Sequence, residues 1–213
     1  MVGSTTTGKG TAQVQLDTLA YGQATLTQRK FYRVTGGSTQ NKGVIPDIKL
    51  VDIYNEEFGE RKAKNALKWD TIPTAPFKRE GSVQPYVQNL AQLSQQRVVN
   101  DPQFKYLEQR KAIAKKTDEQ KRVVLDIDQR KAELNALEQQ TLESENQRRA
   151  VTGQKPYANW ESYQASIDAL IESRAKMKAA KRPALAEEEV FVTESAQVLL
   201  DYAKLQSTKA SAK

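Results

Sequence analysis

The residues that could do chemistry lie at the start of the chain, where Lys9 stands between two glycines, Gly8 and Gly10. Glycines let the backbone approach its neighbours closely, so a lysine between them can be packed into a poorly solvated pocket. Desolvation disfavours the charged form of a buried lysine. A neutral lysine can accept the proton of a serine hydroxyl, which is the Ser-Lys variant of nucleophilic catalysis. The alternative is a solvated loop lysine, which the local pattern alone favours.

The same stretch begins like a phosphate-binding loop, because Gly3 and the Gly8-Lys9 pair have the spacing of that motif. Such a loop needs Ser or Thr after the lysine to reach a magnesium ion, and Gly10 stands there instead. It should also lead into a helix, whereas residues 12–17 alternate apolar and polar side chains as a strand does. We therefore expect neither a nucleotide nor a metal or other cofactor.

Two residue types are missing, since the 213 residues include no Cys and no His. The first absence excludes disulfides, thiol nucleophiles and thiolate metal sites. The second excludes the usual base of a serine hydrolase triad and the commonest transition-metal ligand. A catalytic base from this chain must therefore be a lysine or a carboxylate. Among the lysines, Lys9 has the setting suited to this role, between two glycines. No run of residues approaches the roughly 20 apolar residues of a membrane span.

The net charge of +7 makes a nucleic acid one partner to consider. A nucleic-acid surface would concentrate basic residues on one face, whereas both signs are interspersed here, as in residues 115–122. We therefore expect solvated helix faces and no nucleic-acid site.

The first part of the chain is predicted to be rich in strands. Residues 11–19, 24–34 and 48–53 have the pattern of strands, and turn residues separate them. Three strands cannot close a core unaided, so we expect a small, incomplete sheet. Residues 56–68 are expected to form loop or a short helix, followed by Trp69 as an anchor against the sheet.

The composition changes after a stretch rich in proline and threonine at residues 71–76. Glycine nearly vanishes after Gly81, and helix-forming residues take over. The sequence therefore predicts an α+β protein in which a β-rich segment precedes a mainly helical domain. The predicted parts are a β-rich segment with an incomplete sheet at 1–77, a helical domain at 78–206 and a disordered tail at 207–213.

Helix-end signals locate the helices of the second part. Asp101 is predicted to cap a helix that begins at Pro102, since proline favours the first helical position. Asp128 is predicted to cap the next helix, which Gly153 and Pro156 end. The predicted helices span about 85–100, 102–116, 128–151, 159–181 and 193–205.

Further stretches follow the Gly8–Gln13 segment in a characteristic order: KFYRVTGGSTQ at 30–40, KGVIPDI at 42–48 and NALKWD at 65–70. Together they resemble the end of the protease domain of the tail-specific proteases, also called carboxy-terminal processing peptidases. The remainder, including NDPQF at 100–104 and LLDYAKL at 199–205, resembles the C-terminal helical domain of that family. The resemblance covers nearly the whole chain and is densest up to Phe77.

The resemblance implies an activity and two catalytic residues. Lys9 matches the general-base lysine of the family, and Gln13 matches the glutamine that orients this lysine in related processing peptidases. The family's nucleophilic serine lies well before the lysine, and Ser4 is no substitute for it. We therefore expect the chain to be a fragment of a periplasmic serine endopeptidase. By itself the fragment should be inactive, and Lys9 should be more solvated than in the whole enzyme.

The resemblance also implies partners. These are protein substrates with apolar, unstructured C-termini, an adaptor protein on the helical domain, and at most peripheral contact with a membrane. The fragment should also self-associate through its sheet edge, because unpaired backbone groups invite another strand. The alternative is a non-catalytic helical module that docks substrate or an adaptor. Leu134, Leu137 and Leu142 could form its binding seam, although such a stripe more often packs inside its own domain.

Overall fold

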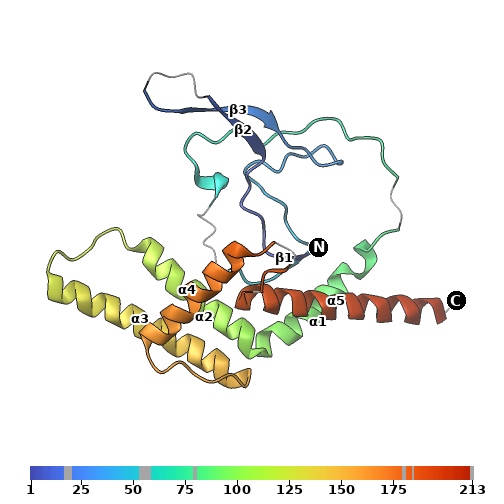
Figure 1. Ribbon diagram of the computed structural model, residues 1–213. Helices are drawn as coiled ribbons and strands as arrows, with labels where there is room; N and C mark the ends of the chain where they lie inside the picture. Colours follow the sequence, from blue (N-terminus) through green and yellow to red (C-terminus); the bar gives the residue numbers. More distant parts are fainter. Residues whose placement is uncertain (17–20, 53–58, 79–80, 179–180, 184, 212–213) are drawn as a thin grey trace. The chain divides into compact units, whose positions relative to one another are not determined.

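The computed structural model describes residues 1–16, 21–52, 59–78, 81–178, 181–183 and 185–211 (Figure 1). Within these residues the chain is mainly helical, with short strands near its start, which confirms the predicted α+β class. The chain divides into two compact units. One comprises Met1–Leu50 and Asn55–Gln88, and the other comprises Val51–Tyr54 and Asn89–Lys213. The predicted domain boundary after residue 77 stays a prediction.

The first unit contains two two-stranded sheets. The strands β2 (Thr11–Leu16) and β3 (Ala24–Lys30) form an antiparallel hairpin, whose register shifts between Ala12 and Gln13. The strand β1 (Val2–Gly3) pairs in parallel with β4 (Ile48–Lys49). Both predicted strands of the hairpin are present within the described residues, but the second ends at Lys30 and not at 34, since Tyr32 pairs with Ser38 in an isolated bridge instead.

The third predicted strand, 48–53, differs from the expectation. Only Ile48–Lys49 is a strand, and it pairs with the start of the chain instead of extending the hairpin. Leu50 explains the difference, since its amide donates to the Gly3 carbonyl at 2.8 Å and its side chain is buried. Residues 53–58 lie outside the described part of the chain.

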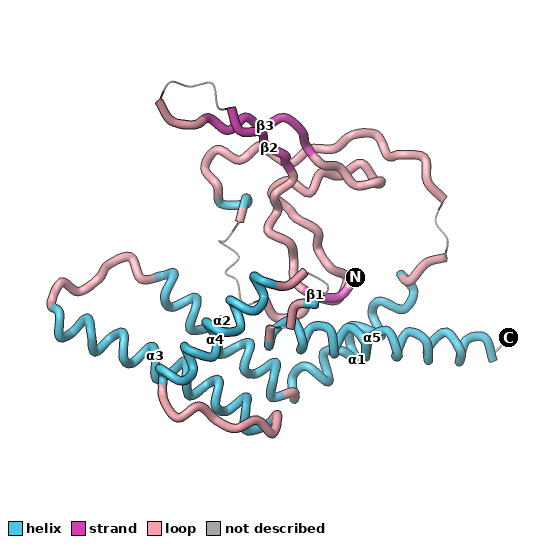
Figure 2. The backbone as a smooth tube through the Cα atoms, in the orientation of Figure 1, coloured by secondary structure: helices cyan, strands magenta, loops and turns pink. Residues whose placement is uncertain are grey.

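Most of the first unit is loop and turn (Figure 2). Trp69 anchors a loop and not the sheet, because its indole N–H donates to the Ser38 carbonyl at 2.8 Å. The Lys42 ammonium lies 3.3 Å from the centre of the Trp69 ring, as in a cation–π pair. The described part of the predicted loop or short helix at 56–68 contains one 3-10 turn, η1 (Glu60–Lys62).

Helices make up the second unit. A 3-10 turn, η2 (Gln84–Tyr86), leads into the first of them. The helix α2 packs along α3, α3 packs against α4, and α2 also contacts α5 (Figure 1). The buried apolar core includes Leu90, Phe104, Leu107, Leu142, Tyr163, Val190 and Val198. The helices are α1 (Val87–Asn100), α2 (Pro102–Glu119), α3 (Ile127–Val151), α4 (Trp160–Lys176) and α5 (Ala186–Ser211).

Side-chain caps begin three of these helices. Asp101 caps α2 as predicted, with its carboxylate accepting from the Gln103 amide at 2.7 Å. Asn159 caps α4 in a reciprocal capping box with Ser162. The predicted cap Asp128 is wrong. Asp126 caps α3 instead, because its carboxylate reaches the first free amides of the helix and leaves Asp128 inside the first turn.

The ends of the last two helices also differ from the prediction. The helix α4 ends at Lys176 and not at 181, and α5 begins at Ala186 and not near 193. Three acidic residues, Glu187–Glu189, lie in the first turn of α5, where negative charge stabilises the helix dipole. The helix continues to Ser211, into the tail predicted to be disordered at 207–213, and residues 212–213 lie outside the described range.

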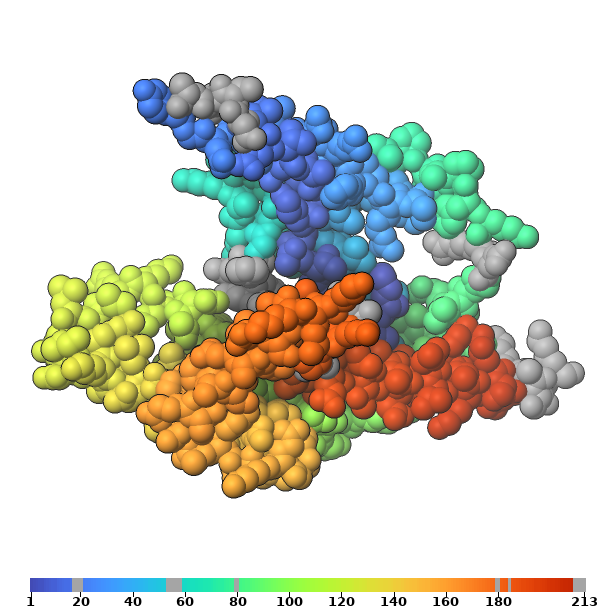
Figure 3. Space-filling view, viewed as in Figure 1, coloured from blue at the N-terminus to red at the C-terminus, as the bar shows by residue number. Residues whose placement is uncertain are grey.

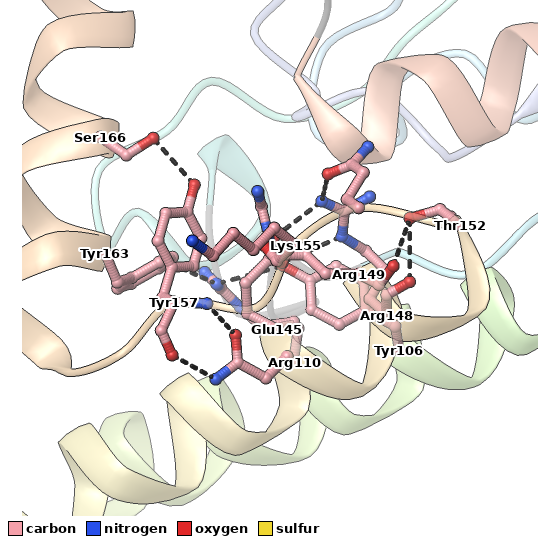
Figure 4. Close-up of polar contacts among 12 residues, drawn as sticks. Tyr106, Arg110, Glu145, Arg148, Arg149, Thr152, Lys155, Tyr157, Tyr163 and Ser166 are labelled. Atoms are coloured by element: carbon pink, nitrogen blue, oxygen red, sulfur yellow. Dashed lines mark hydrogen bonds and ion pairs between the residues drawn. The ribbon is translucent and has the colours of Figure 1, made fainter.

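A buried polar cluster joins α2, α3 and α4 (Figure 4). The Arg148 guanidinium donates twice to the Glu145 carboxylate, at 2.7 and 2.9 Å, and lies 5.5 Å from the centre of the Tyr106 ring. Arg110 donates to the Tyr163 hydroxyl at 3.2 Å. A buried charge is tolerated when it is paired and hydrogen-bonded, so this cluster can sit within the core and fix how the three helices meet.

Candidate functional site

Lys9 lies in the loop before β2, and both neighbouring glycines are buried. A Cβ atom on Gly10 would lie 2.3 Å from the backbone nitrogen of Gln40. One on Gly8 would lie 2.7 Å from the Asn41 carbonyl oxygen, and Gly8 has a φ of +83°. Any side chain at either position would therefore collide with the backbone of residues 40–41. This is the close backbone approach that the Gly-Lys-Gly pattern predicts.

Hydrogen bonds hold the backbone on both sides of Lys9. Before it, the Gly8 carbonyl accepts from the Asn41 amide at 2.8 Å. After it, the Gly10 amide donates to the side-chain oxygen of Gln40 at 2.8 Å, and the Gly10 carbonyl accepts from the Phe31 amide at 2.7 Å. The Cα of Lys9 is thus fixed although its side chain extends into solvent.

The structure brings Lys9 and Gln13 together. The Lys9 Nζ lies 3.2 Å from Gln13 Oε1 and 3.3 Å from Thr11 Oγ1. The Gln13 Nε2 in turn donates to Thr27 Oγ1 at 3.4 Å, and Thr27 faces Gln13 directly across the hairpin. The bond to Thr27 orients the Gln13 amide so that its oxygen points at Lys9.

This arrangement suits a base. A neutral amine has two hydrogens and one lone pair, and the oxygens of Gln13 and Thr11 can accept the two hydrogens. The lone pair is then free to take a proton from a third group. The Lys9 side chain is exposed here, so the described residues do not form the poorly solvated pocket that the two glycines would allow. The catalytic roles of Lys9 and Gln13 stay predictions.

A charged pair lies at the C-terminal end of β3. Lys30 Nζ is 2.9 Å from the Asp70 carboxylate, and the Tyr32 hydroxyl donates to the same carboxylate at 3.2 Å. The hydrogen bond from Lys30 holds the pKa of Asp70 below its ordinary value. Lys30 faces Thr11 in the hairpin register. The pair therefore ties the hairpin base to the segment after residue 68.

Comparison with known proteins identifies the family. Residues 53–204 match the family model described as "C-terminal domain of tail specific protease (DUF3340)". The chain belongs to this family. It is also 34% identical, over 168 residues, to the "Tail-specific protease" of Haemophilus influenzae (strain ATCC 51907 / DSM 11121 / KW20 / Rd). That match covers 73% of this chain and 24% of the relative, so the chain spans about a quarter of the curated relative's length.

The tail-specific protease resemblance seen in the sequence is thereby confirmed. The range matched by the family model begins after the Lys9 segment, so it bears on the helical part and not on the candidate site. Among the helices within the described ranges, none is long and apolar enough to cross a membrane. The described residues also contain no group of three or more acidic side chains placed to hold a metal ion.

Sequence reasoning missed three residues of the site, Thr11, Thr27 and Gln40. Thr11 is two positions beyond Lys9, which is a local signal that could have been used. Thr27 and Gln40 reach the site only through the hairpin register and through a loop that returns 30 residues later. No local spacing indicates those two contacts.

Proposed function

We propose that this chain is the C-terminal part of a serine endopeptidase of the Ser-Lys type, with Lys9 as its general base. The observation that carries the proposal is the position of Lys9 Nζ, 3.2 Å from Gln13 Oε1, on a backbone fixed by two buried glycines. Membership of the tail-specific protease family supports a peptidase as the whole protein. The nucleophilic serine and the oxyanion donors would come from outside residues 1–213.

In the proposed reaction the serine hydroxyl attacks the scissile carbonyl while Lys9 Nζ accepts its proton. The resulting ammonium keeps its hydrogen bonds to the oxygens of Gln13 and Thr11, which stabilise the positive charge. Lys9 then returns the proton to the departing amine. Gln13 holds the lysine in place in both steps.

The substrates, location and contacts of the whole protein belong to the same proposal. The resemblance to tail-specific proteases supports protein substrates with apolar, unstructured C-termini and a periplasmic site of action. Contact with a membrane would be peripheral, and no nucleic acid would be bound. The isolated chain would be inactive and would self-associate through an edge of the β2–β3 hairpin.

Substitution of Lys9 in the full-length protein tests the proposal. Lys9→Ala should abolish hydrolysis of an unstructured protein substrate without unfolding the protein, and Lys9→Arg should be equally inactive because a guanidinium stays protonated. Gln13→Ala should be milder, since one hydrogen bond contributes about 0.5–1.5 kcal/mol. Lys64→Ala, which removes another exposed lysine of the first unit, is the matched control and should keep full activity. Activity in Lys9→Ala would refute the proposal.

The second candidate function is a docking module for a substrate or an adaptor protein. Its supporting observation is a groove of about 540 Å³ where the turn between α1 and α2 meets α5, with Phe104 and Val190 in its wall. On α5, which is drawn in red in Figure 3, Val192 and Leu199 are exposed. Of the predicted leucine seam, Leu142 is buried inside the domain.

The two functions separate in a binding experiment on the full-length protein. Docking by the helical unit should survive Lys9→Ala and should weaken on Leu199→Glu, which places a charge on the exposed side of α5. Loss of activity in Leu199→Glu with unchanged binding would count against the docking function.

A further inference from the structure

Gln40 is the most deeply buried polar side chain near Lys9, with none of its surface exposed. Both ends of its amide are in use. The oxygen Oε1 accepts from the Gly10 amide at 2.8 Å, and the nitrogen Nε2 donates to the Glu60 carboxylate at 3.1 Å. A buried amide is costly unless its hydrogen bonds are made, so these contacts fix which way it points.

Gln40 also closes a ring of four hydrogen bonds. Its backbone amide donates to Ser38 Oγ at 3.0 Å, and this hydroxyl donates to the Phe31 carbonyl at 3.1 Å. The Phe31 amide donates to the Gly10 carbonyl at 2.7 Å. The Gly10 amide donates to the Gln40 side-chain oxygen, and this fourth hydrogen bond completes the ring. The peptide unit that follows Lys9 is therefore held at its N–H by Gln40, while the next carbonyl is held by Phe31.

The approach of the two segments adds a steric constraint. Gly10 lies so close to Gln40 that a Cβ atom would meet the Gln40 nitrogen, Cα and Cβ within 3 Å. The peptide after Lys9 can therefore neither rotate nor move away without breaking the ring. That peptide sets the direction in which the Lys9 side chain leaves the backbone, and so where Nζ meets Gln13.

We propose that Gln40 is a positioning residue for the general base, which holds the Lys9 peptide in its catalytic orientation from the buried side of the loop. This inference rests on the proposed function of Lys9. Gln40 contacts no reacting atom and acts through Gly10. Glu60 is its support, because it accepts from Nε2 and keeps the amide oxygen directed at Gly10.

The pairing of Gln40 with Glu60 offers a reciprocal test. Gln40→Glu places a second carboxylate beside Glu60, so repulsion should displace the oxygen that Gly10 needs. Adding Glu60→Gln restores a donor and an acceptor with their places exchanged, while a carboxylate oxygen still accepts from Gly10. Glu60→Gln alone keeps an acceptor for Gln40. Gln15→Glu is the control for added charge, because Gln15 is exposed on the β2–β3 hairpin next to the site.

The experiment measures kcat and KM of the full-length variants on an unstructured protein substrate, with kcat expressed per folded molecule as determined by circular dichroism and urea unfolding. Gln40→Glu should lower kcat about 10–100-fold, as expected for a small misplacement of a catalytic group, and leave KM within about twofold of the parent value. The double variant should recover most of this loss. Glu60→Gln and Gln15→Glu should stay near the parent value.

Three results would decide against the proposal. One is full kcat in folded Gln40→Glu, and another is a folded double variant that stays as inactive as the single one. The third is a loss that disappears once activity is expressed per folded molecule, because a purely structural role lowers only the amount of folded enzyme. Lys9→Ala separates the two levels: if it is active, the proposed function fails, and if it is inactive while Gln40→Glu is fully active, only the positioning role fails.

Discussion

At the scale of single residues, Tyr106 is a buried ionisable group in the core of the helical unit. Burial raises the pKa of its hydroxyl above the ordinary value. Its ring lies beneath the Arg148 guanidinium, and its side chain is only 6% exposed. An ionised Tyr106 would place an extra charge inside a cluster whose carboxylate, Glu145, already pairs with Arg148.

Alkaline unfolding should therefore depend on Tyr106. Because the folded pKa is raised, the neutral hydroxyl is compatible with folding below about pH 10, and stability is lost as pH rises through the interval between the unfolded and folded pKa values. Each pH unit in that interval should lower the free energy of unfolding by about 1.4 kcal/mol. Tyr106→Phe removes this contribution, so urea unfolding at pH 8 to 11 should give a flatter profile. Equal slopes for both proteins would contradict the assignment.

Residue types predicted part of the candidate site and could not predict the rest. Lys9 and Gln13 stand four positions apart in one segment, so their contact follows from local structure. Thr27 meets Gln13 only because the hairpin pairs in one register, and Gln40 meets Gly10 only because a distant loop returns. Both contacts depend on tertiary structure, which no spacing within a segment specifies.

At the scale of elements, the start of α3 offers a sharp test of a corrected assignment. The Asp126 side chain accepts from the amides of Asp128 and Gln129, at 3.1 and 2.8 Å. Asp126→Ala should destabilise the helical unit by about 1 kcal/mol, since it removes a cap. Asp128→Ala should cost less, about 0.3–1 kcal/mol, because it removes only a favourable charge in the first turn. Thermal unfolding of both variants measures the order, and a larger effect at Asp128 would contradict it.

The helices were more predictable than the strands for a physical reason. Caps such as Asp101 and Asn159 act within three residues of the helix they begin. The pairing of Ile48–Lys49 with Val2–Gly3 joins segments more than 40 residues apart, so the sequence pattern of 48–53 could not reveal it. The helix α5 begins before the predicted start near 193, and its first turn contains three glutamates, where negative charge is favourable.

At the scale of the whole molecule, the segment between the strands and the helices should be the first site of proteolysis. Every residue from 71 to 78 is exposed, and beyond the bridge at Thr71 the backbone of this segment is held by hydrogen bonds from the amides of Ile72 and Ala75 to residues 36 and 34. Limited digestion followed by mass spectrometry should give a first cut between about Thr71 and Gly81, or in the last residues of the chain, and a stable helical product. Early cuts within α2 or α3 would show that the helices lack a core of their own.

Composition predicted the two-part character of the chain but not how its residues group. Glycine-rich turns and helix-forming runs differ in local preference, so the change near residue 77 is visible in the sequence. Assignment of Val51 and Asp52 to the helical unit, apart from their neighbours in sequence, depends on contacts between segments distant in the chain. Such grouping follows from packing and has no compositional signal.

The central claim is that the amine of Lys9 accepts the proton from the nucleophile. Because residues 1–213 contain no cysteine, Lys9→Cys places a unique thiol in this part of the protein. Reaction with 2-bromoethylamine displaces bromide by the thiolate sulfur and rebuilds an amine at the length of lysine. Reaction with 2-bromoethanol gives the same length with a hydroxyl in place of the amine.

The decisive measurement is peptidase activity of the full-length Lys9→Cys protein before and after each reagent. The account predicts an inactive variant, recovery of activity after aminoethylation, and no recovery after hydroxyethylation. Activity before treatment, equal recovery with both reagents, or no recovery in a folded and fully aminoethylated protein would contradict it.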